Sequence, residues 1–204
     1  LNALADVAKE VLPSGYSYAF AESSQQEVEA GSKTVYALSL GILFVFLSLA
    51  ALYESWKIPF TVLFGLPTGF FGATIAAFLF NVYNDIYFQI GLLTIIGLAA
   101  KNAILIVEYA KVRVDNGMDI VESAIEASEI RLRPILMTSL AFILGNIPLA
   151  LSSGAGSVSR SEMGIAVVFG VTSATIFQIF IVPMLFIALE KIHFSSLTQF
   201  LTKK

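Results

Sequence analysis

The chain has 204 residues, of which 57% are hydrophobic and 13% charged, and its formal net charge is -3. A mean hydropathy of +0.82 excludes an ordinary water-soluble domain and indicates a membrane protein. Cysteine is absent, which excludes disulfides and thiolate metal ligands. The four methionines are scattered, so they give no support to a metal path built from thioethers.

Position 1 is leucine and the first apolar run starts only at about residue 34. We therefore expect no signal peptide and a longer parent protein.

Residues 1–30 predict a helix followed by a strand. Apolar side chains recur at helical spacing over residues 1–12, and Pro13 ends the pattern. Residues 15–20, GYSYAF, alternate with aromatic side chains at every second position, as in a strand. Because a helix and a strand alone are too small to fold, we expect the end of a soluble domain. Residues 21–33 would link it to the membrane.

Long uncharged intervals predict a transmembrane domain over residues 31–190, since a span takes about 20 apolar residues. The five expected spans are 34–53, 58–80, 87–109, 134–152 and 162–189. Before the fourth span, residues 117–130 predict a separate amphipathic helix on the inner membrane surface. Pro134 would then lie in the first turn of the fourth span, where a helix accepts proline. Residues 191–204 would form a cytoplasmic tail.

Small residues line one face of the second span. Gly65, Gly69, Gly72 and Ala76 follow one another at spacings of three and four, which predicts close packing against a neighbouring helix. A functional hinge is the alternative. Pro67 in the same span predicts a kink.

The distribution of Lys and Arg predicts the orientation. If the N-terminal segment lies outside, eight Lys and Arg fall in inner segments and three in outer segments. Because inner loops carry the excess of positive charge, we expect the chain to start outside and end in the cytoplasm.

Lys101 is a charge in the middle of the third span. It lies eight residues before Tyr109 at the inner end, a distance of roughly 12 Å along a helix. A charge at this depth costs from about 3 to above 10 kcal/mol, so it is normally kept only where it pairs or faces a polar cavity. A lysine that merely reaches a headgroup or a water is the alternative.

The sequence offers no partner at the depth of Lys101. Among the acids nearest to the spans are Asp85, Glu108, Glu162 and Glu190, and each of them lies at a span end. We therefore expect the counter-charge to come from a segment outside this chain. A lysine paired with a membrane carboxylate suits a proton relay, because protonating the acid removes the attraction. Asn102, Thr138 and Ser139 could add hydrogen bonds, although such residues are also common in helix packing.

Three long motifs resemble the resistance-nodulation-division (RND) efflux transporters, hydrophobe/amphiphile branch. They are YFQIGLLTIIGLAAKNAILIVEYA, RLRPILMTSLAFILGNIPL and SSGAGSVSRSEMGIAVVFG. The resemblance implies an all-α membrane protein: five transmembrane helices of an RND C-terminal half, preceded by a helix-strand remnant of the α+β porter domain. It covers nearly the whole chain except the tail KIHFSSLTQFLTKK.

The same resemblance implies a function. Such a transporter is a homotrimer in the bacterial inner membrane that takes up protons, expels drugs and other amphiphilic compounds, and confers antibiotic resistance. It works with a periplasmic adaptor protein and an outer-membrane channel, and it needs no cofactor beyond the proton-motive force. Lys101, Arg131 and Thr138 match the family's proton relay, Asn102 would support them, and the N-terminal half would supply two aspartates.

Other functions remain to be weighed against this one. A proton-coupled accessory of protein or lipid translocation, in the same superfamily, would share the relay but lack a drug-binding porter. An intramembrane enzyme would need a nucleophile with a base, or paired aspartates, within the spans, and the sequence has neither. Nothing in the sequence indicates binding to nucleic acid or metal. We therefore expect a secondary active transporter rather than an enzyme.

Overall fold

The computed structural model describes residues 2–13, 15–19 and 22–201, and helices account for almost all of them. The helices are α1 (Asn2–Val11), α2 (Glu22–Tyr53), α3 (Lys57–Gly65), α4 (Pro67–Phe80), α5 (Ile86–Asp115), α6 (Ile120–Ala150) and α7 (Ser157–Leu201). Five stretches are long and apolar enough to cross a membrane: Tyr36–Tyr53, Ile58–Phe80, Ile86–Asp115, Ile120–Ala150 and Ser157–Lys191. The prediction of an all-α protein with five candidate spans is confirmed.

The predicted strand at residues 15–20 is not confirmed. Within that segment, residues 16–19 have no regular secondary structure. A strand needs a neighbouring strand for its backbone hydrogen bonds, and the described part of the chain contains none. The helix expected before it is present as α1.

The second span is interrupted, as Pro67 predicts. α3 ends at Gly65 and α4 begins at Pro67, which lacks an N–H group and sits at the start of its helix. Around the break, the N–H groups of Leu66 and Gly69 donate to carbonyls three residues back, at 3.0 Å. The carbonyl of Gly65, freed by this tightening, accepts hydrogen bonds from the side chains of Thr68 and Gln178.

The separate amphipathic helix predicted at residues 117–130 is not separate. Helix α6 runs without a break from Ile120 through Pro134 to Ala150. Pro134 therefore lies well inside the helix and not in its first turn. A membrane helix tolerates an internal proline where other groups satisfy the freed backbone, so the proline does not mark the start of the span.

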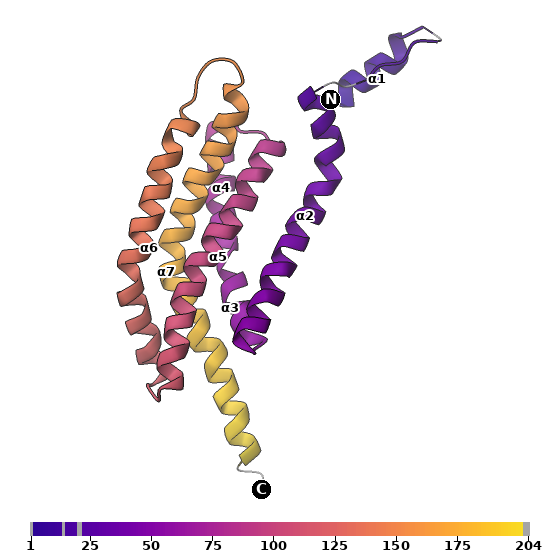
Figure 1. Cartoon of the computed structure of the whole chain (residues 1–204). Helices are drawn as coiled ribbons and strands as arrows, with labels where there is room; N and C mark the ends of the chain where they lie inside the picture. Colours follow the sequence, from indigo (N-terminus) through magenta and orange to yellow (C-terminus); the bar gives the residue numbers. More distant parts are fainter. Residues whose placement is uncertain (1, 14, 20–21, 202–204) are drawn as a thin grey trace.

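A tight turn joins α5 to α6. Asp119 caps the start of α6 by accepting a hydrogen bond from the N–H of Val121 at 3.0 Å. Gly117 in the turn has φ +92, a conformation that favours glycine. The two helices consequently run antiparallel, side by side (Figure 1).

Helix α7 is the centre of the bundle. It packs against α3, α4, α5 and α6, while α2 flanks the bundle beside α3 and α5 (Figure 1). Gly69 and Gly72 of α4 are buried against α7, as the small-residue pattern predicts. An added Cβ at Gly72 would lie 2.6 Å from the carbonyl oxygen of Phe169 and closer still to the side chain of Ser173. Only glycine allows this approach.

Candidate functional site between α5 and α6

Three side-chain contacts connect α5 to α6 along their antiparallel seam. Asn102 bonds to Ser139, Tyr109 lies under the guanidinium of Arg131, and Arg113 forms an ion pair with Glu126. From the first contact to the third, the residue numbers rise on α5 and fall by similar amounts on α6, as expected for antiparallel helices. The contacts therefore lie one after another along the seam between two largely apolar helices.

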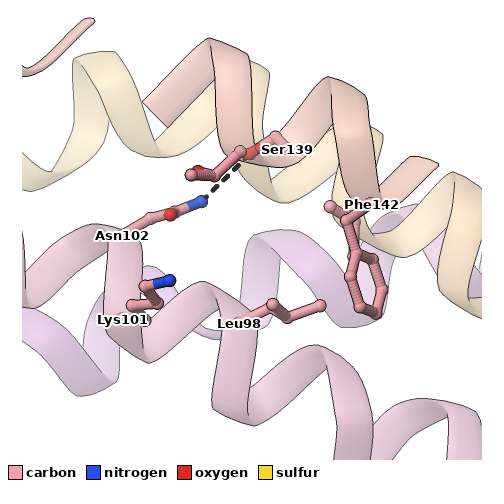
Figure 2. Close-up of a pocket in the computed structure, with 7 residues that line it drawn as sticks. Leu98, Lys101, Asn102, Ser139 and Phe142 are labelled. Carbon is pink, nitrogen blue, oxygen red and sulfur yellow. Dashed lines mark hydrogen bonds between the residues drawn. The ribbon is translucent and has the colours of Figure 1, made fainter. Parts of the chain in front are cut away.

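A cavity of about 110 Å³ lies at the Asn102 end of this row. Leu98, Lys101 and Asn102 approach it from α5, and Ser139 and Phe142 approach it from α6 (Figure 2). The α5 residues share one face because they are three and four positions apart on a helix. Thr138 and Val171 complete the lining. A space of this size holds water where polar groups line it.

Lys101 is the charged residue in the cavity wall. Its side chain is exposed, and among the described residues no carboxylate comes within ion-pair distance of it. This agrees with the sequence, in which the acids near the spans all lie at span ends. The part of the chain that the structure describes thus presents a mid-span ammonium group without a counter-charge.

Asn102 and Ser139 form the buried polar contact beside Lys101. They are 5% and 4% exposed, and the Asn102 Nδ2 group donates to Ser139 Oγ at 3.3 Å. Figure 2 shows this bond crossing from α5 to α6 next to the lysine. The bond fixes the spacing of the two helices at the cavity.

Thr138 lines the same cavity but bonds within its own helix. Its hydroxyl oxygen lies 3.1 Å from the carbonyl oxygens of both Pro134 and Ile135, to which it donates its proton. The hydroxyl proton is therefore engaged, while the lone pairs on its oxygen are still able to accept a hydrogen bond from water or from an ammonium group. The structure thus brings Lys101, Asn102 and Thr138 together.

Arg131, the fourth predicted residue, lies elsewhere along the seam. It precedes Thr138 by seven residues, which corresponds to about 10 Å along a helix. Its guanidinium carbon lies 5.1 Å from the centre of the Tyr109 ring. Arg131 is therefore nearer to the loop that joins α5 and α6 than to the cavity.

Sequence reasoning missed the surroundings of Arg131 and a buried glutamine. Tyr109, Arg113 and Glu126 form the cluster at Arg131, yet the pattern along the chain indicates only that they lie near a span end. Gln178 is 1% exposed and its Nε2 group donates to the Gly65 carbonyl at 3.2 Å. A single amide in an apolar span is a signal that could have been noticed.

The sequence has close relatives among known transporters. The sequence model of the AcrB/AcrD/AcrF family matches residues 1–190. The toluene efflux pump membrane transporter TtgB of Pseudomonas putida is 51% identical over 181 residues, which are 89% of this chain and 17% of that protein. The multidrug export protein AcrF of Escherichia coli is 50% identical over 88% of this chain and 18% of its own length.

The multidrug resistance protein MdtF of Escherichia coli is similar to the same extent. It is 48% identical over 180 residues, which cover 88% of this chain and 17% of the relative. The chain thus spans less than a fifth of the length of the curated relatives it matches. With a family match over residues 1–190 and about half of the aligned positions identical, the chain belongs to the AcrB/AcrD/AcrF family of RND transporters.

Proposed function

We propose that this chain forms the proton-coupled part of a longer efflux pump in the bacterial inner membrane. The pump would be a secondary active antiporter that exports drugs and other amphiphilic compounds and is driven by the proton-motive force without a further cofactor. Two of the relatives are named as export or efflux proteins, for toluene and for multiple drugs. Those names support efflux over a role in protein or lipid translocation.

The observation that carries the proposal is the unpaired charge of Lys101. A mid-span ammonium is costly unless it is paired, and the described residues place no carboxylate beside it. A carboxylate from the rest of the transporter would complete the pair. When that acid takes up a proton, the attraction is lost and Lys101 is free to turn to the oxygens of Thr138 and Asn102.

The proton can shift the helices only if two arrangements bind it differently. There would be two such arrangements. In one, Lys101 pairs with a carboxylate outside the α5–α6 seam, and in the other it turns into the cavity at that seam. The cavity is lined by Thr138 and Asn102, which can accept hydrogen bonds from the ammonium group. Arg131 would act nearer the cytoplasm, where the electrostatic repulsion from its permanent positive charge would influence the path of the departing proton.

The family resemblance supports the assembly that we propose for the pump. We expect a homotrimer whose N-terminal halves supply the aspartates that pair with Lys101. A periplasmic adaptor protein and an outer-membrane channel would carry the substrate across the rest of the envelope. Residues 21–33 would connect the membrane helices to the porter domain that binds the substrate.

The test is dye efflux from cells that express the complete transporter with Lys101→Met. Methionine keeps much of the length of lysine and removes its charge, so we expect efflux to fall to the level of cells without the pump. Lys111→Met is the matched control. Lys111 is on the same helix but pairs with Asp115 at 3.5 Å near the helix end, and its loss should leave efflux near the parental rate. With membrane levels and trimer content matched, normal efflux by Lys101→Met would refute the proposal.

A further inference from the structure

Tyr109 on α5 lies between two arginines. The guanidinium carbon of Arg113 is 4.9 Å from the centre of its ring, and that of Arg131 is 5.1 Å away. Both distances are within the range of about 6 Å in which a cation is attracted to an aromatic face. Arg113 is one helical turn further along α5, whereas Arg131 belongs to α6.

The two arginines differ in their other contacts. Arg113 donates to Glu126 Oε2 at 2.7 Å and to the Tyr109 hydroxyl at 2.6 Å. Within the described residues, Arg131 makes neither a hydrogen bond nor an ion pair, and its Nε atom is buried without a partner. In this part of the chain, the cation–π contact with the Tyr109 ring is thus the interaction that holds the Arg131 guanidinium.

The orientation of the Tyr109 ring is itself fixed from α6. Glu126 anchors Arg113, and Arg113 in turn holds the Tyr109 hydroxyl. These contacts connect Glu126 to Arg131, five residues later on the same helix, through two residues of α5. A movement of α5 relative to α6 at this point would therefore move the Arg131 guanidinium.

We propose that Tyr109 is a positioning residue for Arg131. This inference rests on the proposed function, in which Arg131 lies in the proton path. Arginine keeps its proton in proteins, so it would act through the place of its charge and its N–H donors and not by carrying the proton. The Tyr109 ring fixes that place and directs the unpartnered Nε–H of Arg131 into the protein.

Efflux by the reconstituted complete transporter tests this role when the proton gradient and the substrate concentration are varied separately. In Tyr109→Leu, we expect the proton concentration for half-maximal efflux to change by about fivefold. This is the factor to which the loss of a typical cation–π contact corresponds. The substrate concentration for half-maximal efflux should not change. Tyr109→Phe keeps the ring but loses the hydroxyl bond to Arg113, so its value should lie between those of Tyr109→Leu and the parent. Arg113→Gln removes the anchor at a partly exposed position and should cause a smaller change in the same direction.

The controls separate this inference from the proposed function. Tyr83→Leu changes a tyrosine that is 79% exposed, so neither concentration should change. If Arg131→Ala leaves the proton dependence as in the parent, the proposed proton path through Arg131 is wrong. If Arg131→Ala alters it while Tyr109→Leu and Arg113→Gln do not, the path stands and the positioning role of Tyr109 is refuted. A fall in maximal rate alone would also refute the positioning role, since that is what a loss of folded protein produces.

Discussion

Lys101 occupies a site in which every described neighbour is neutral. Leu98, Phe142 and Val171 supply the apolar part of the cavity wall, and Asn102, Thr138 and Ser139 supply oxygens and an amide. These groups can solvate an ammonium but cannot neutralise it. The cavity therefore suits a lysine that alternates between a carboxylate partner and these neutral groups. It suits a permanently paired lysine less well.

The bond between Asn102 and Ser139 should contribute measurably to the stability of this site. Hydrogen bonds between membrane helices contribute about 0.6 kcal/mol on average and up to roughly 1.7 kcal/mol. Both side chains are buried, so we expect a coupling energy of about 1 kcal/mol. The measurement is a double-mutant cycle of Asn102→Ala and Ser139→Ala, followed by unfolding of the complete transporter in mixed detergent micelles. Fully additive losses would show that the two side chains do not interact.

At the scale of whole helices, α7 holds the bundle together through close contacts with α4. Gly72 lets the two backbones approach, and Ser173 Oγ donates to the Thr68 carbonyl at 2.7 Å across the same interface. Such contacts replace the hydrophobic effect, which gives no driving force between helices in lipid. The α4–α7 pair therefore forms a closely packed support for the α5–α6 seam, where we propose that the motion occurs.

Gly72→Ala should weaken this support. The added Cβ would lie too close to the side chain of Ser173 and 2.6 Å from the Phe169 carbonyl, and a helix backbone cannot give way without moving α7. We expect a loss of about 1–3 kcal/mol, typical of overpacking. In the matched control, Gly41→Ala, the Cβ would meet Leu93 at 3.8 Å, an ordinary contact. The midpoints of detergent-induced unfolding measure both changes, and equal midpoints for the two variants would contradict this packing.

The elements differ in how far the sequence could predict them. Long uncharged intervals were enough for the five candidate spans, because the cost of burying charge in lipid is large. Pro134 misled the prediction of α6, since tertiary contacts allow a helix to continue through a proline. The cavity residues could be grouped by the unusual charge of Lys101. The contact of Tyr109 with Arg131 joins residues 22 positions apart, and it depends on helix register, which no local pattern contains.

For the whole molecule, the orientation in the membrane is the feature that the proton path requires. The excess of Lys and Arg in the segments predicted to lie inside predicts that the α5–α6 turn lies in the cytoplasm and the α6–α7 loop in the periplasm. Arg131 would then lie nearer the cytoplasm than Lys101, and protons would pass from the cavity toward it.

Cysteine labelling tests this orientation, and the chain itself contains no cysteine that would interfere. In the complete transporter, with cysteines elsewhere replaced, Ser153→Cys in the α6–α7 loop should react with a membrane-impermeant maleimide in cells whose outer membrane is permeabilised. Asn116→Cys at the end of α5 should react only after the inner membrane is opened. The reverse pattern would place the N-terminal segment in the cytoplasm and invert the proposed path.

The most direct test of the central claim, that Lys101 couples protons to efflux, is proton movement in proteoliposomes that contain the complete transporter. When substrate is added to the parent, protons should cross the membrane. The rate of proton movement should be proportional to the rate of substrate transport. Lys101→Met should move none above the lipid background, and Lys111→Met should move them as the parent does. Substrate-dependent proton movement by Lys101→Met at the parental rate would contradict the account.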